Sequence, residues 1–236
     1  MAYDKNSISV ILPTFNEQEN IQEMIRQLNL YVKPNEIIVI DDNSKDKTRD
    51  LAKSSSKNVI VINRVNKRGV ASAIYDGIKR SNGKIVVWLD ADLSMPPIII
   101  PKMIGEIINN GYAITVGSRY VKGGSDKRPF LRVLTSKALN LFALLLLGYG
   151  IRDYDSGFVV SRRNVFEQVT FNVGGHGEYC IEFLYNAAKK GYKIKEVPYI
   201  FTDRKAGKSK TVSNILSLPV HGLNYGFRIL KLKFFN

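Results

Sequence analysis

The stretch Lys84-Ile85-Val86-Val87-Trp88-Leu89-Asp90-Ala91-Asp92 is an apolar run that ends in two carboxylates. Its β-branched residues predict a strand covered on both faces. Similar short apolar runs occur elsewhere in the first half of the chain, at 8–12, 36–40, 59–62 and 113–117. Segments with helical spacing lie between them, at 17–30, 71–81 and 97–109. This alternation predicts an α/β fold with a Rossmann-like, mostly parallel sheet and helices on both faces.

The second half of the chain is less regular. Residues 132–147 have the spacing of a helix with a broad apolar face, and 178–190 that of another helix. Residues 153–163 and 192–201 read as extended, and a polar, basic loop follows at 202–210. We find no repeat, low-complexity tract or clear linker, which favours one domain over 1–210 with an amphipathic segment at 211–236.

Composition narrows the possible partners. The 236 residues include 35 Lys and Arg against 21 Asp and Glu, for a net charge of +14. Such an excess points to nucleic acid, an anionic membrane or phosphorylated substrates. The single cysteine excludes an internal disulfide and fits a reducing compartment.

The chain shows no obvious membrane span or targeting signal. Its first seven residues are polar, unlike a signal peptide. The longest apolar run, Leu141 to Leu147, is far shorter than the ~20 residues that cross a bilayer. We therefore expect no transmembrane segment in this chain.

Carboxylates follow the strand at 84–89, where a parallel sheet binds its ligands. Asp90 and Asp92 can grip one hard cation, and Mg²⁺ or Mn²⁺ would share such oxygen ligands with substrate phosphates. The alternative is a pair of capping residues before the helix near Pro97.

Other polar groups follow neighbouring strands. Asp41-Asp42-Asn43-Ser44 could accept hydrogen bonds from a base or a ribose, or could form a turn and helix cap. Guanidinium and ammonium groups suit phosphates, although each is also compatible with solvated surface charge. The candidate phosphate ligands are Arg119, Arg132, Arg204, Lys208 and Lys210.

The order of the motifs along the chain resembles that of a known protein family. It begins with Pro13-Thr14-Phe15-Asn16-Glu17 and Asp41-Asp42-Asn43-Ser44 and continues through Arg68-Gly69, Asp90-Ala91-Asp92-Leu93-Ser94, Gly117-Ser118-Arg119-Tyr120, Arg132 with Ser136-Lys137, Ser156-Gly157-Phe158, Glu178-Tyr179-Cys180-Ile181-Glu182 and Asp203-Arg204 with Gly207-Lys208-Ser209-Lys210. Over nearly the whole chain this set resembles the inverting GT-A nucleotide-sugar glycosyltransferases of family 2. It looks most like their polyprenyl-phosphate sugar synthases, the group of the dolichyl-phosphate mannose synthases.

The resemblance implies roles for individual residues. The nucleotide-sugar would be bound by Pro13, Phe15, Glu17, Asp42, Asp90, Ala91, Asp92, Arg119, Arg204 and Lys210. The metal would be held by Asp90 and Asp92, with Ser94 at the position of a third ligand. Arg132, Ser136 and Arg204 would meet the acceptor phosphate, and Asp92, Arg119 and Arg204 would be catalytic.

Three positions depart from the family pattern. Phe15 replaces the usual Tyr, and Ser94 stands where many relatives carry Gln. Asp153-Tyr154-Asp155 replaces the commoner Asp-Pro-Thr before Ser-Gly-Phe, which is expected to alter the acceptor site.

The expected reaction is metal-dependent transfer of a hexose, with mannose favoured, to dolichyl or polyprenyl phosphate. GDP-mannose is the favoured donor and UDP-glucose the alternative; a saccharide or protein acceptor is a further alternative. A phosphate acceptor is anionic at neutral pH and needs no general base, and the residues offer no well-supported base.

The lipid acceptor implies a membrane partner. Residues 139–147 and 218–235 offer apolar surface, so we expect a peripheral protein at the cytoplasmic face of a membrane, with a separate membrane subunit possible. A basic nucleic-acid-binding module is the non-enzymatic alternative. The spread of the basic residues and the acidic pairs argue against it, so no nucleic-acid partner is expected.

Overall fold

The computed structural model describes residues 8–174, 178–204 and 218–235. A seven-stranded sheet has the order β3-β2-β1-β4-β7-β5-β8. Its strands are β1 (Ile8–Thr14), β2 (Glu36–Asp41), β3 (Val59–Asn63), β4 (Ile85–Trp88), β5 (Ile114–Ser118), β7 (Val159–Arg162) and β8 (Ile194–Pro198). All neighbours are parallel except β7, which runs antiparallel to both β4 and β5. The mostly parallel sheet is therefore confirmed, with one antiparallel strand inserted between β4 and β5.

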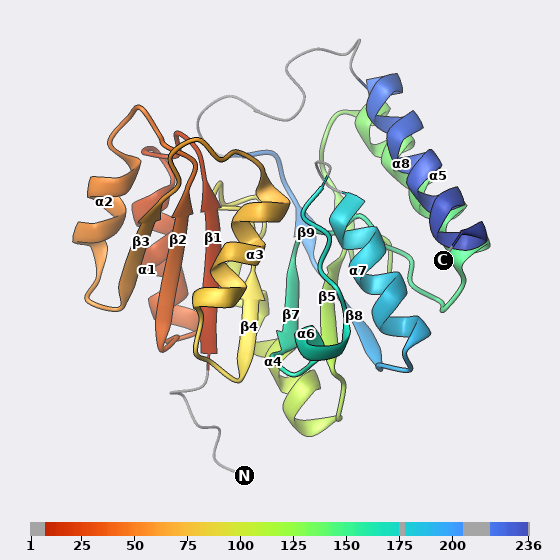
Figure 1. The fold of residues 1–236 in the computed structure, drawn as a ribbon, viewed down its shortest axis with the longest axis horizontal. Helices are drawn as coiled ribbons and strands as arrows, with labels where there is room; N and C mark the ends of the chain where they lie inside the picture. Colours follow the sequence, from red (N-terminus) through yellow and green to blue (C-terminus); the bar gives the residue numbers. More distant parts are fainter. Residues whose placement is uncertain (1–7, 175–177, 205–217, 236) are drawn as a thin grey trace.

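Helices cover both faces of the sheet (Figure 1). They are α1 (Ile21–Tyr31), α2 (Thr48–Ser55), α3 (Val70–Arg80), α4 (Ile100–Asn109), α5 (Phe130–Leu147), α6 (Val165–Gln168), α7 (Glu178–Lys189) and α8 (Leu218–Phe234). A 3-10 turn, Pro97–Ile99, precedes α4, and a small parallel pair joins β6 (Ser125–Asp126) to β9 (Ile200–Phe201).

The alternation of side chains in the strands divides the core into two apolar clusters. Val10 and Leu12 of β1 pack in one cluster with α1, α2 and α4, whereas Ile11 between them packs in the other with α3, α6 and α7. Successive strand residues point to opposite faces, so one strand supplies both clusters.

Two long helices, α5 and α8, lie side by side at one end of the molecule (Figure 1). Ile229 and Leu232 anchor α8 in the core that also contains Ala143 and Leu147 of α5. Arg228 of α8 also forms an ion pair with Glu182 of α7, at 3.3 Å. The C-terminal segment expected at 211–236 is thus, over residues 218–234, a helix packed on the domain.

Within the described residues, α5 is long and apolar enough to cross a membrane by length and composition alone. The apolar run Leu141 to Leu147 is too short to predict a membrane-spanning helix. The helix reaches that length only because it begins at Phe130. One side of α5 contacts the protein, where Ser136 and Asn140 are buried, and Leu141 and Leu145 on other sides are exposed.

Candidate active site

A cavity of about 350 Å³ opens where β4 and β5 end at their carboxyl termini. Asp90, Asp92 and Ser94 form part of its wall. Basic residues Arg119, Arg128 and Arg132 and the helix α5 residues around Ser136 line another part, and Tyr225 of α8 and Arg204 complete it. The sheet thus brings together the acidic and basic residues that the sequence placed after separate strands, as the rule for parallel sheets predicts.

The two carboxylates are held by a tight turn after β4. Leu93, between Asp92 and Ser94, has a φ of +65°, a left-handed conformation that costs free energy for a residue with a side chain. The Ser94 hydroxyl donates to Asp92 Oδ1 at 2.6 Å, and the Ser94 amide donates to the same oxygen at 3.1 Å. In this arrangement Ser94 orients Asp92 with its hydroxyl.

Negative charge is concentrated at this turn. Burial, and then the nearby Asp92 and Glu17, raise the pKa of Asp90 to about 7, and Arg204 opposes them. Arg204 lies 3.0 Å from Asp92 Oδ2 and 3.3 Å from Glu17 Oε1. A crowded carboxylate pair that already attracts a guanidinium is a suitable place for a cation.

The donor set fits a divalent ion that is bound partly by its substrate. Among the described residues no group of three acidic, His or Cys side chains is placed to hold a metal. Mg²⁺ is commonly bound through one or two carboxylates and takes its other ligands from water and substrate phosphates. Asp90 and Asp92 match that two-carboxylate mode.

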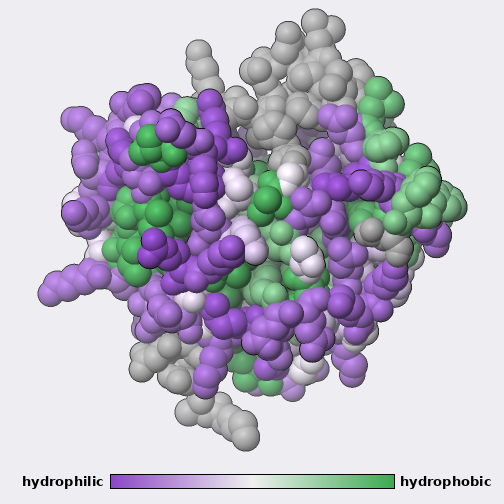
Figure 2. Space-filling model, viewed as in Figure 1, coloured by the Kyte–Doolittle hydropathy of each residue, from purple (hydrophilic) through white to green (hydrophobic). Residues whose placement is uncertain are grey.

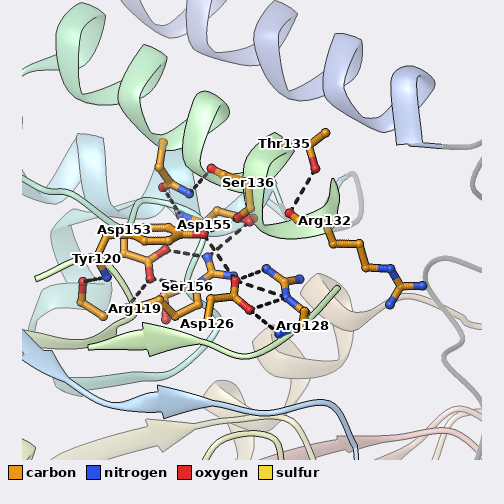
Figure 3. A network of polar contacts seen from close by, with 12 residues as sticks. Arg119, Tyr120, Asp126, Arg128, Arg132, Thr135, Ser136, Asp153, Asp155 and Ser156 are labelled. Atoms are coloured by element: carbon orange, nitrogen blue, oxygen red, sulfur yellow. Dashed lines mark hydrogen bonds and ion pairs between the residues drawn. The ribbon is translucent and has the colours of Figure 1, made fainter. Parts of the chain in front are cut away.

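Figure 3 shows a buried ionic network around Arg119. Asp153 binds this guanidinium twice, at 2.9 Å to Nε and 2.6 Å to Nη2, and accepts the Arg119 amide at 2.8 Å. Asp155 lies 3.6 Å from Nη2, and Asp126 lies 3.8 Å from Nη1. Burial lowers the pKa of Arg119, but Asp153 and Asp155 outweigh it and hold the pKa well above its ordinary value.

The carboxylates in this network differ in their environment. Burial raises the pKa of Asp126, but hydrogen bonds from Arg128 reverse the effect and leave the pKa below its ordinary value. Burial raises the pKa of Asp155 to about 6, although Arg119 lowers it in part. Of these two carboxylates, Asp155 is therefore the one whose cost of burial is only partly offset by the neighbouring arginines.

The acceptor residues expected from sequence lie on the α5 side. Ser136 accepts a hydrogen bond from the Tyr120 hydroxyl at 2.9 Å. Arg132 lines the same cavity, but its side chain extends away from the Arg119 network (Figure 3). Sequence analysis did not identify Arg128, Asp126 or Tyr225 as site residues. Asp126 and Arg128 form an ion pair two residues apart, just before α5, and this pairing of opposite charges was the signal in the sequence that could have identified them.

Four of the expected nucleotide residues, Pro13, Phe15, Glu17 and Asp42, lie at or just after the ends of β1 and β2, and none of the four is among the residues that line the cavity. The Arg68 guanidinium stacks over the Phe15 ring at 4.0 Å from its centroid. Asp42 accepts two hydrogen bonds from Arg64 and one from the Gly69 amide at 2.8 Å. Asp42 thus joins the end of β2 to the start of α3.

Pro13 and Ala91 lie at the ends of β1 and β4, at the same edge of the sheet, and Ala91 is buried. Lys208 and Lys210 lie outside the described residues. The nucleotide and acceptor roles of all these residues stay predictions.

A family model described as Glycosyl transferase family 2 matches residues 9–170, well over half of the chain. The chain belongs to glycosyl transferase family 2. The glycosyltransferase family predicted from the motif order is confirmed.

Two curated relatives of this family 2 chain bear related names. A dolichol-phosphate mannosyltransferase of Pyrococcus furiosus is 41% identical over 86% of the chain, which spans 58% of that protein's length. A polyprenol monophosphomannose synthase of Mycolicibacterium smegmatis is 32% identical over 93% of the chain and 86% of its own length. The resemblance to polyprenyl-phosphate sugar synthases is thereby confirmed.

The solved structures agree on the fold. A glucosyl-3-phosphoglycerate synthase from Mycobacterium tuberculosis, in complex with Mn²⁺, uridine diphosphate and glucosyl-3-phosphoglycerate, aligns with a TM-score of 0.74. It is 21% identical, and the alignment covers 96% of this chain and 80% of that one. The same enzyme with Mg²⁺ and uridine diphosphate aligns with a TM-score of 0.75 at 19% identity, over 96% of this chain and 79% of that one. At this identity the likeness establishes the GT-A fold, which confirms the fold prediction.

Proposed function

We propose that this chain transfers a mannosyl group from GDP-mannose to a polyprenyl or dolichyl phosphate. The observation that carries the proposal is a single cavity with paired carboxylates in one part and basic and hydroxyl residues beneath exposed apolar helices in another. The names of the two curated relatives support the mannosyl and polyprenyl assignments.

At the donor end, Asp90 and Asp92 would hold Mg²⁺ or Mn²⁺ together with the diphosphate. The ion would supply positive charge to the leaving nucleoside diphosphate, where negative charge develops. Ser94 keeps the Asp92 carboxylate in position through its hydroxyl. Arg204, now 3.0 Å from Asp92, is within reach of the same diphosphate and would add a second charge to it.

At the acceptor end, the lipid phosphate would be met by Arg132 and Ser136 of α5, together with Arg204. A phosphate oxygen is already anionic, so attack on the anomeric carbon needs no proton removal by the protein. Inversion follows if that oxygen approaches opposite the leaving diphosphate.

The lipid tail would leave the cavity along α5 and α8. The exposed apolar residues of these helices include Phe130, Leu134, Leu141, Leu145, Leu223, Phe227 and Phe234. Figure 2 shows a hydrophobic band over α8 at the right-hand edge of the molecule. Lys231 and Lys233 in the last turn of α8 suit an anionic headgroup layer. We propose that the protein docks peripherally at the cytoplasmic membrane face through these helices.

The test is a transfer assay with a labelled sugar. It compares GDP-mannose with UDP-glucose as the donor, each in the presence and in the absence of polyprenyl phosphate. We expect a lipid-linked product from GDP-mannose that needs a divalent ion and polyprenyl phosphate. Asp92→Ala should abolish transfer, and Asp50→Ala, an exposed carboxylate in α2, should keep it. No lipid-linked product from any pairing, or transfer by Asp92→Ala at the wild-type rate, would refute the proposal.

A further inference from the structure

The two carboxylates of Asp153-Tyr154-Asp155 hold Arg119 in different ways. The Asp153 side chain is completely buried and binds Arg119 through both oxygens at 2.6 and 2.9 Å. The Asp155 side chain is 21% exposed, and its contact with Nη2 is 3.6 Å, too long for a good hydrogen bond. Asp153 therefore anchors Arg119, and Asp155 is an outer counterion that an incoming anion can replace.

Asp155 also faces the part of the cavity that is offered to the acceptor. Both Asp155 and Arg119 line the cavity, with Ser136 on the adjoining wall of α5. The Asp155 amide donates to Asn140 Oδ1 at 3.3 Å, which fixes its backbone one helical turn from Ser136. In Figure 3 Asp155 lies between Ser136 and the guanidinium of Arg119. An acceptor phosphate that reaches Ser136 thus approaches this carboxylate.

From this geometry we propose that Asp155 sets the affinity of the cavity for the acceptor anion, by competing with that anion for the outer face of Arg119. The inference rests on the proposed function for the identity of the acceptor, a phosphate monoester. When Asp155 is charged, the phosphate must displace it and tolerate a neighbouring like charge. When Asp155 is neutral, that competition disappears, and the phosphate alone interacts with the side of Arg119 that lines the cavity.

The competition should depend on pH, because the pKa of Asp155 is raised to about 6. Arg119 and Arg128 favour its charged form, and Asp153 disfavours it. Asp126 lies 3.8 Å from Nη1 of Arg119, and Cys180 of α7 and Tyr225 of α8 lie near enough to Asp155 to interact with its charge. Above about pH 6 the carboxylate is ionised and competes; below it, the protonated form does not.

The experiment compares the wild-type chain with Asp155→Asn, which removes the charge and keeps the shape. The matched control is Asp203→Asn, which removes a charge from an exposed residue in the wall of the same cavity. At about pH 8 we expect Asp155→Asn to lower the KM for polyprenyl phosphate about fivefold or more, with the donor KM little changed. Asp203→Asn should lower the acceptor KM much less.

The pH comparison separates the effect from general electrostatics. At about pH 5 the acceptor KM values of wild type and Asp155→Asn should converge, since Asp155 is then protonated in the wild type. The titration of the phosphate itself is common to both proteins and cancels in the ratio. An unchanged or higher acceptor KM in folded Asp155→Asn at about pH 8, or an equal effect in Asp203→Asn, would overturn the inference.

A second readout keeps the inference independent of turnover. Calorimetric titration with inorganic phosphate, without donor, should show tighter binding to Asp155→Asn than to wild type at about pH 8 and equal binding at about pH 5. If no polyprenyl phosphate is ever glycosylated, the proposed function fails, and this titration still decides the role of Asp155. Equal phosphate binding by both proteins at about pH 8 would refute that role.

Discussion

At the scale of single residues, the site is organised by how completely each charge is paired. Arg119 is almost completely buried and is surrounded by three carboxylates, so its positive charge is largely neutralised within the protein. Asp90 and Asp92 have the opposite arrangement, two close carboxylates partly balanced by Arg204. The less balanced region is the one at which we propose that a cation binds.

Asp153→Asn should destabilise the protein strongly, because it leaves Arg119 buried without its closest partner. Breaking one side of a buried pair costs about 3–5 kcal/mol, measurable as a loss of unfolding free energy in urea. The matched control is Glu23→Gln, which breaks the exposed pair with Arg26 and should leave the urea midpoint unchanged. Equal urea midpoints for wild type and Asp153→Asn would show that Asp153 does not anchor the loop.

Asp155→Asn should have the opposite effect at neutral pH. The folded-state pKa of Asp155, about 6, lies above its ordinary value of 3.8, so the folded state favours the protonated form. That contribution is present at low pH and is lost as the pH rises from 3.8 through about 6. The variant should therefore be more stable than wild type at neutral pH, by at most ~3 kcal/mol, and equally stable near pH 4. A urea series across pH tests this, and a deficit in the variant at every pH would contradict it.

At the scale of elements, packing distinguishes residues that look alike in sequence. Gly83 precedes β4, where a Cβ would lie 2.6 Å from the backbone nitrogen of Ser9, and its amide donates to the Ser9 hydroxyl. Gly105 lies within α4, where the nearest atom to an added Cβ is 3.9 Å away. One glycine is required by a close approach of two strands, and the other is not.

The same substitution at these two positions should therefore act in opposite directions. Gly105→Ala should stabilise the protein by about 0.5–1 kcal/mol through helix propensity. Gly83→Ala should destabilise it, since the methyl group meets backbone atoms that cannot move aside cheaply. Thermal unfolding of both variants provides the measurement, and a stabilised Gly83→Ala would refute the close approach.

The membrane docking that we propose depends on α5 and α8 together. Each buries one side against the protein, and together they expose one apolar surface. Phe227→Glu should weaken binding to anionic vesicles, measured by sedimentation, by about tenfold or more, since burying one large apolar side chain contributes ~1.5–3 kcal/mol. The control, Leu30→Glu on the distant helix α1, should bind as wild type does (Figure 1). Equal vesicle binding by Phe227→Glu and wild type would refute this docking surface.

At the scale of the whole molecule, the sheet places in one cavity the carboxylates proposed to bind the donor and the basic residues proposed to bind the acceptor. Mn²⁺ together with GDP should raise the thermal midpoint more than either alone, since each completes the other's ligands at Asp90 and Asp92. Saturation at about a hundredfold excess over Kd contributes ~2.7 kcal/mol. Differential scanning fluorimetry measures this, and Asp92→Ala should lose the joint effect. The same joint shift in Asp92→Ala would show that the ion binds elsewhere.

The sequence by itself determined the fold class and most of the main elements. Apolar runs and helical spacing predicted strands β1 to β5 and helices α1, α3 and α4, because local patterns of burial reflect local structure. The motif order identified the family, and the rule for parallel strands placed Asp90 and Asp92 at the cavity.

Only the tertiary structure decided which charges pair and which face the cavity. Asp153 meets Arg119 across 34 residues of chain, and the antiparallel strand β7 between β4 and β5 brings them together. No local pattern encodes such a contact, because it depends on the order of strands in the sheet. Asp153 and Asp155 are two residues apart and chemically identical, yet one is a completely buried anchor and the other a partly buried counterion, since their burial is set by the packing around Arg119.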